Sequence, residues 1–198
     1  MTPRVQLVPL DVAVLDALAA GDEAAARRLA PVPLTPWLTG PECRRTWAMR
    51  ARQVAGDPGA ADWITRVVLD AERGLAVGRA GFHGPPDGDG MVEVGYAIDP
   101  RFRRQGYARA ALRALLAEAA LAPGVTTVRA SVSPDNVASR DLVRSEGFVR
   151  VGEQMDDEDG LEIVHERTVG TRSAAPATSM PRASRSPRVV RATSMPRT

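Results

Sequence analysis

The stretch from Val92 to Ala120 constrains the fold more than any other part of this sequence. It reads as a strand, a short polar turn and a long helix. The turn has the pattern Arg-x-x-Gly-x-Ala and runs from Arg103 to Ala108. A turn that opens a helix presents free backbone N–H groups and the positive end of the helix dipole, so it predicts an anion-binding site. The helix has one apolar face, made of Ala108, Ala111, Leu112, Leu115, Leu116 and Ala119.

Periodicity and punctuation by proline and glycine predict the elements around this stretch. Helices are expected at Val12–Ala20, Glu23–Leu29, Glu42–Val54 and from Asn136 to about Glu146. Strands are expected at Val5–Pro9, Trp63–Leu69, Leu75–Phe82, Met91–Ile98, Thr127–Val132, Phe148–Met155 and Leu161–Val169. The pattern indicates a single α/β (α+β) domain over residues 1–169.

Prolines predict irregular backbone across Pro31–Pro41, a segment that holds Trp37 and Leu38. This segment is either the wall of a substrate pocket or a surface loop with a buried tryptophan. The acidic run Asp156–Gly160 is interpreted as a hairpin tip rather than a calcium site, because the EF-hand pattern is absent. No metal site is predicted.

Charge separates the chain into two parts. All 26 basic residues are arginines, and six of them follow Val169, where there is no acid. The body therefore carries 20 arginines against 24 acids, a net charge of −4, although the whole chain carries +2. Residues 170–198 are rich in Ser, Ala, Pro and Arg, which predicts a disordered tail. Such a tail binds polyanions weakly, so a nucleic-acid partner is not favoured, although a tether to RNA or the ribosome stays open.

The location is predicted to be cytoplasmic. The chain has no run of 18 apolar residues, so no membrane-spanning helix is expected. A membrane is therefore not expected as a partner. Asp11 interrupts the apolar N-terminus before a secretory signal is formed. Cys43 is the one cysteine and cannot form an internal disulfide, so we expect a structural or surface thiol.

Coenzyme A is the anion whose chemistry suits the turn and its neighbouring strands. Backbone N–H groups suit a diphosphate, and Gly106 allows the backbone to approach it closely. Arg103 and Arg104, with Arg101 or Arg109, add charge-assisted bonds to phosphate oxygens. The amide-bearing pantetheine arm can hydrogen-bond like an additional strand where two strands splay apart.

Two motifs then resemble the GCN5-related N-acetyltransferase (GNAT) family. They are GYAIDPRFRRQGYARAAL and SPDNVASRDLVRSEGF, in that order and at the family's separation. The second motif, with Asn136-x-x-Ser139 followed by Glu146-Gly147-Phe148, resembles the RimJ/RimL-like branch, which includes the acetyltransferases of ribosomal-protein N-termini. The resemblance implies a mixed, mostly antiparallel sheet of six to seven strands, with splayed central strands and about four helices. It also implies direct attack by an amine on the thioester of acetyl-CoA, with no acyl-enzyme.

The resemblance also implies the roles of individual residues. Amides of the turn bind pyrophosphate, the end of the strand before it binds pantetheine and polarises the thioester carbonyl, and Asn136 contacts the cofactor arm. Ser139 lies near the leaving sulfur. The residues expected to bind the cofactor are therefore Tyr96, Ala97, Ile98, Arg103, Arg104, Gln105, Gly106, Tyr107, Ala108, Asn136 and Ser139.

The acid and the base are less well defined by the resemblance. Many members carry a tyrosine where this chain has Val143, so Ser139 or a water molecule must protonate the thiolate here. Glu93 resembles a position that acts as a base through water, and it also suits a pocket wall. The two histidines, His83 and His165, are expected at the surface.

The sequence thus predicts an N-acetyltransferase that transfers the acetyl group of acetyl-CoA to a primary amine. The acceptor is a protein N-terminus, an amino acid or a small amine, and the acidic body does not repel a cationic one. A non-catalytic acyl-CoA-binding regulatory module is the alternative, because the usual tyrosine is missing. A monomer and a homodimer both fit.

Overall fold

The computed structural model describes residues 2–156 and 160–170. Residues 157–159 of the acidic run and all of the predicted tail except Gly170 lie outside the described residues. The strands form one seven-stranded sheet of order β1-β2-β3-β4-β5-β7-β6, in which every neighbouring pair is antiparallel except β4 and β5. The strands are β1 (Val5–Val8), β2 (Arg66–Asp70), β3 (Leu75–Phe82), β4 (Met91–Ile98), β5 (Thr127–Val132), β6 (Val149–Asp156) and β7 (Gly160–Thr168).

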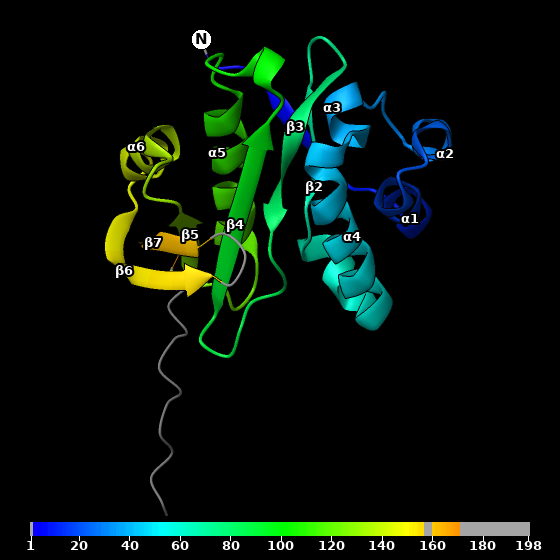
Figure 1. The fold of residues 1–198 in the computed structure, drawn as a ribbon. Helices are drawn as coiled ribbons and strands as arrows, with labels where there is room; N and C mark the ends of the chain where they lie inside the picture. Colours follow the sequence, from blue (N-terminus) through cyan, green and yellow to red (C-terminus); the bar gives the residue numbers. More distant parts are fainter. Residues whose placement is uncertain (1, 157–159, 171–198) are drawn as a thin grey trace, which may run out of the picture.

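The described residues form six α-helices and two short 3-10 helices, more than the four or so expected. The α-helices are α1 (Val12–Ala20), α2 (Glu23–Leu29), α3 (Pro36–Thr39), α4 (Pro41–Gly56), α5 (Tyr107–Leu121) and α6 (Val137–Ser145), and the 3-10 helices are η1 (Pro58–Trp63) and η2 (Pro100–Phe102). Figure 1 shows α1–α4 on one side of β2–β4, α5 on the other and α6 beside β5 and β7.

Each face of the sheet has its own hydrophobic core. Helix α5 buries the apolar face predicted from its sequence, with Leu112 and Leu115 fully buried against the sheet. On the opposite face, Trp47 of α4 packs in a second core with Val67 of β2. Burial of these two faces holds β3 and β4 between two helical layers, which gives the central strands a rigid setting.

The prediction of irregular backbone across Pro31–Pro41 is wrong in part. Residues 36–39 form α3, and Pro41 begins α4. Both prolines occupy the first helical turn, where the missing N–H has no intrahelical acceptor to lose. Thr35 caps α3 by accepting a hydrogen bond from the Leu38 N–H at 3.4 Å. These prolines therefore start helices instead of excluding them.

The strand predicted at Trp63–Leu69 begins later, at Arg66. Residues 58–63 form η1 instead, in which Pro58 occupies the first turn. Asp57 caps this helix by accepting a bond from the Gly59 N–H at 2.9 Å. The aspartate and proline outweigh the apolar character of Trp63, which packs on Phe82 with ring centroids 5.5 Å apart.

Strands β4 and β5 pair over three residues and then separate. The parallel register joins Met91–Glu93 to Thr127–Arg129. Strand β4 continues to Ile98 and stays paired with β3 along that length. Its other edge is therefore open from about residue 94 onward, as the expectation of splayed central strands requires.

Candidate active site

A groove of about 1010 Å³ runs along the open edge of β4, over the turn at the start of α5 and up to α6. It collects residues from both sequence motifs. Gln105 is the one predicted cofactor-binding residue that does not line the groove, since its side-chain amide donates to the Arg101 carbonyl at 3.2 Å. The predicted residues that line it are Tyr96, Ala97, Ile98, Arg103, Arg104, Gly106, Tyr107, Ala108, Asn136 and Ser139.

The turn that opens α5 has an unusual backbone. Arg104 has φ 64° and Gly106 has φ 87°, both in the left-handed region. A non-glycine residue held there carries strain that surrounding structure must offset, and such strain gathers at binding sites. The first turn of α5 has no intrahelical acceptors for its N–H groups, so they are available to an anion. Arg103, Arg104 and Arg109 add positive charge along the same groove.

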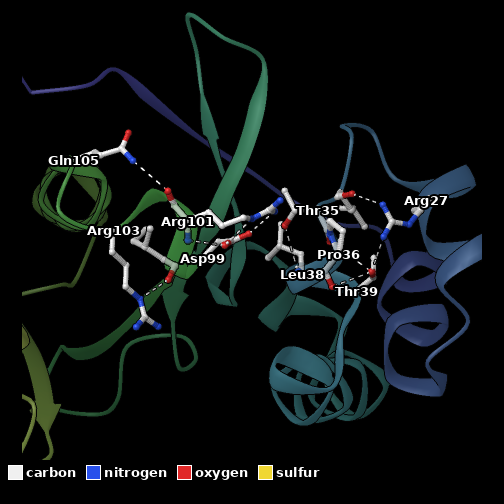
Figure 2. Close-up of polar contacts among 11 residues, drawn as sticks. Arg27, Thr35, Pro36, Leu38, Thr39, Asp99, Arg101, Arg103 and Gln105 are labelled. Carbon is white, nitrogen blue, oxygen red and sulfur yellow. Dashed lines mark hydrogen bonds and ion pairs between the residues drawn. The ribbon is translucent and has the colours of Figure 1, made fainter.

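Asp99 anchors this turn to the helical layer on the other side of β4 (Figure 2). Its buried carboxylate accepts bonds from the Arg101 backbone N–H at 3.0 Å and from the Arg101 guanidinium at 2.8 Å. These bonds from Arg101 lower the pKa of Asp99, and a bond from the Thr35 side chain at the start of α3 lowers it further. Arg103 Nε donates to the Ile98 carbonyl at 3.1 Å, which ties the turn to the end of β4.

The side chain of Tyr107 serves the fold. Its hydroxyl donates to Asp70 Oδ2 at 2.6 Å, and the residue is 3% exposed. Asp70 is the last residue of β2 and accepts bonds from the β2–β3 turn, so this bond fixes the start of α5 against that hairpin. The predicted cofactor role of Tyr107 is thus left to its backbone N–H.

Ser139 and Tyr96 meet across the groove. Asn136 caps α6, and its Oδ1 accepts a bond from the Ser139 N–H at 3.1 Å. The Ser139 hydroxyl lies 2.7 Å from the Tyr96 hydroxyl. Burial raises the pKa of Tyr96, so the phenol holds its proton at neutral pH. Sequence reasoning gave Tyr96 a backbone role and missed this side-chain contact between residues 43 positions apart.

Val143, where the resemblance noted above implies a tyrosine in many members, lies on the buried face of α6 and is fully buried in the core. An apolar side chain there cannot donate a proton. The hydroxyl pair of Ser139 and Tyr96 is therefore one proton-bearing group of this groove, which Ser133 also lines.

Glu93 and His83 lie together outside the groove. The His83 Nδ1 is 4.0 Å from Glu93 Oε2, with the two side chains 50% and 20% exposed. Their backbones also meet, because the His83 N–H donates to the Glu93 carbonyl at 2.8 Å. Desolvation lowers the pKa of His83, while the charge of Glu93 opposes that change.

The other expectations divide. His165 is fully buried, so the prediction of a surface residue is wrong for it: β7 is an inner strand between β5 and β6, and Arg140 and Arg144 of α6 lie close to the ring. Cys43 is buried in α4, and burial raises the pKa of its thiol, as suits a structural role.

Within residues 2–156 and 160–170, no group of three or more His, Cys, Asp or Glu residues is placed to hold a metal ion. None of the helices in those ranges has the length and apolarity to cross a membrane.

Comparison with known families gives the class of protein that this fold and groove define. The family described as the acetyltransferase (GNAT) domain matches residues 4–149. The chain belongs to the GNAT family and is an acetyl-CoA-dependent acyltransferase. The uncharacterized N-acetyltransferase YjdG of Bacillus subtilis (strain 168) is 29% identical over 150 residues, which cover 75% of this chain and 88% of YjdG.

Solved structures agree on the fold. A GNAT-family acetyltransferase from Bordetella pertussis is 25% identical, with a TM-score of 0.58 over 84% of this chain and 97% of that one. RimJ of Mycobacterium smegmatis, in complex with CoA-disulfide, is 20% identical, with a TM-score of 0.58 over 83% and 81%. The ribosomal L7/L12 acetyltransferase RimL, in complex with coenzyme A, is 17% identical, with a TM-score of 0.58 over 84% and 94%.

Proposed function

We propose that this protein transfers the acetyl group of acetyl-CoA to a primary amine by direct attack in a ternary complex. One observation carries the proposal. The open edge of β4, the turn at the start of α5 and the Tyr96–Ser139 hydroxyl pair all line one groove. A diphosphate, a strand-like amide arm and a leaving thiolate each find a matching protein group along that line. Holding the amine and the thioester together supplies much of the rate enhancement.

Each end of the groove has a proposed role. The backbone N–H groups from Arg104 to Ala108 bind the pyrophosphate, and the open edge of β4 binds the pantetheine amides. The Ser139 hydroxyl donates a proton to the departing thiolate and is resupplied by Tyr96. Glu93 is the carboxylate that drives loss of the ammonium proton.

The acceptor class follows the branch that the chain resembles. RimJ and RimL share this fold, and a protein N-terminus, an amino acid or a small amine each offers the primary amine required. We propose a cytoplasmic location and a monomeric or homodimeric state. The catalytic domain is proposed to span residues 1–169, with 170–198 as a tail.

Calorimetry of acetyl-CoA binding tests the cofactor site. Gly106→Glu places a carboxylate at the proposed pyrophosphate position, and we expect affinity to fall by at least about tenfold, roughly 1.4 kcal/mol. Gly124→Glu is the matched control, because Gly124 has a similar φ of 81° at the other end of α5, with open space around it. Equal affinity for Gly106→Glu and Gly124→Glu would sink the proposed site.

Turnover is tested by thiol release with a panel of amines: an alanyl peptide, glycinamide and spermidine. Release above the rate of hydrolysis with any of them supports transfer to an amine. Binding of acetyl-CoA without release for every amine would favour the non-catalytic alternative.

A further inference from the structure

We propose that His83 is the general base that removes the proton from the acceptor ammonium. Glu93 positions the imidazole and stabilises its protonated form. This inference rests on the proposed function and names the group that the reaction needs on the acceptor side. It replaces the idea that Glu93 acts directly through water.

The location of His83 relative to the groove is the first argument. His83 directly follows β3, where it continues the pairing with β4 opposite Glu93. Side chains alternate along β4, so Glu93 and Gly95 lie on one face, and Tyr96 lies on the other. The His83 ring folds over Gly95, since a Cβ added there would be 2.7 Å from His83 Nε2. His83 and the Tyr96–Ser139 pair thus flank β4 at neighbouring residues, from opposite faces.

The absence of side-chain bulk leaves room for an amine at this point. Gly95 pairs with Gly81 of β3, and Ala97 follows on the same face. No side chain larger than a methyl group rises from β4 between Glu93 and Asp99 on that face. On β4 itself an amine would meet only Gly95 and Ala97 here, with Arg79 of β3 opposite Ala97 on the same face.

The His83 backbone is fixed on both sides. Its carbonyl accepts bonds from Arg50 Nη1 at 3.0 Å and from Gln53 Nε2 at 2.8 Å, both from α4. Its N–H is bonded to β4, as described above. A half-exposed ring on a rigid backbone can exchange its proton with solvent without losing its position.

The charges around His83 suit a base that works near neutral pH. Desolvation lowers its pKa, and Arg50 of α4 and Arg79 of β3 lower it further. Glu93 of β4 and Asp156 of β6 act in the opposite direction. The ring is therefore neutral before reaction, and the Glu93 carboxylate stabilises the imidazolium that forms afterwards.

The proton balance closes. The ammonium loses one proton to His83 Nε2, and the free amine lone pair forms the new C–N bond at the thioester carbon. The C–S bond breaks, and the thiolate takes a proton from Ser139. The second proton lost by the nitrogen restores the hydroxyl pair, and His83 returns its proton to solvent.

The decisive experiment measures kcat/KM for the amine against pH in wild type and His83→Gln. At pH 7 we expect a loss of about 100-fold in the variant, within the usual range for a general base. The loss of kcat/KM in the variant should become smaller as the pH rises toward the pKa of the amine, because much of the substrate is then already the free amine. Affinity for acetyl-CoA, measured by calorimetry, should stay unchanged. A loss under threefold at pH 7 overturns the proposal.

Two further variants separate this role from a structural one. Added imidazole should restore activity to His83→Ala but not to Ser139→Ala, which lacks the proton donor on the other face. Glu93→Gln should move the acid limb of the profile to lower pH, because Glu93 raises the pKa of His83. If Glu93→Gln abolishes activity while His83→Gln retains it, Glu93 is the base, and our assignment is wrong.

Gly95→Ala tests the position of the ring without changing its chemistry. The added methyl displaces a flexible side chain and no backbone atom, so the protein should fold, and activity should fall with that of His83→Gln. Full activity in Gly95→Ala contradicts the geometry. If wild type acetylates no amine on the panel, the proposed function fails and the base assignment falls with it. If wild type is active and His83→Gln is equally active, only the base assignment fails.

Discussion

At the scale of single residues, the hydroxyl pair of Ser139 and Tyr96 is the feature that most affects the chemistry. The two oxygens are 2.7 Å apart, and the phenol is partly buried with a raised pKa. A proton donor of this kind needs a second group to resupply it, since a serine hydroxyl alone is a weak acid.

We expect the two hydroxyls to act as one unit. Ser139→Ala should lower kcat by roughly 100-fold and Tyr96→Phe by about tenfold, in line with general acid catalysis. The double variant should be no slower than Ser139→Ala, because Tyr96 acts through Ser139. Steady-state kinetics at saturating acetyl-CoA measures all three. Multiplicative losses in the double variant would show that the hydroxyls act independently.

Residues with a local signal were readable from the sequence, whereas residues defined by partners far along the chain were not. Gly106 and Asn136 occupy the turn and the cap that their own neighbours predict. The contacts of His83 with Arg50 and of Tyr96 with Ser139 cross between elements, and no local pattern reports them. His165 was misplaced for the same reason, since its burial depends on strand order.

At the scale of elements, the start of α5 is fastened by one buried hydrogen bond. Asp70 Oδ1 accepts the Glu72 and Arg73 N–H groups of the hairpin turn, and Oδ2 accepts the Tyr107 hydroxyl. The Tyr107 bond is the main factor that lowers the pKa of Asp70. One carboxylate therefore links β2, the turn and α5.

Tyr107→Phe should lower the free energy of unfolding by about 1–3 kcal/mol, because it removes a donor from a buried carboxylate. Urea denaturation at pH 7 measures the change. Tyr96→Phe is the matched control, since it also removes one phenol hydroxyl but leaves a neutral serine behind. A smaller effect for Tyr107→Phe than for the control would contradict the structural role.

Helices and strands with clear periodicity were predicted with their boundaries nearly intact. Residues 12–20, 75–82 and 127–132 match α1, β3 and β5 in full. The failures lie at Pro36, Pro41 and Pro58, where proline starts a helical turn. Proline both breaks and begins helices, and the capping contacts of Thr35 and Asp57 decide which.

At the scale of the whole molecule, the gap between β4 and β5 leaves alternate backbone groups of β4 without a partner strand. The His83 N–H donates to the Glu93 carbonyl, and the Asp99 N–H donates to the Val77 carbonyl. The backbone N–H and C=O groups of odd-numbered β4 residues therefore point to β3. The backbone N–H and C=O groups of Tyr96 and Ile98 point into the gap.

Hydrogen exchange should show this alternation. We expect the amides of Tyr96 and Ile98 to exchange quickly in the free protein and to slow when coenzyme A is added. The amides of Gly95 and Ala97 should stay protected in both conditions because they pair with β3. Slow exchange at Tyr96 and Ile98 without ligand would mean that the edge is already covered.

The buried histidine sets how the stability of the whole molecule responds to acid. Burial lowers the pKa of His165, and nearby Arg144, Arg140 and Arg150 lower it further. The unfolded chain binds this proton first, at a pKa of about 6.5, so stability falls as pH drops through that value toward the folded pKa.

Urea denaturation at pH 7.5 and 5.5 should therefore show lower stability at pH 5.5. His165→Gln should reduce that difference, although it lowers stability at both pH values. His83→Gln is the control for the other histidine, whose pKa is also lowered. An unchanged pH difference in His165→Gln would assign the effect elsewhere.

The short pairing of β4 with β5 also makes the stability of the chain depend on the solution around it. A ligand that occupies the gap binds the folded state alone, so at 100 times its dissociation constant it adds about 2.7 kcal/mol to the free energy of unfolding. That amount is a large part of the free energy of unfolding of an ordinary domain. The lifetime of the folded enzyme should therefore follow the supply of its own co-substrate.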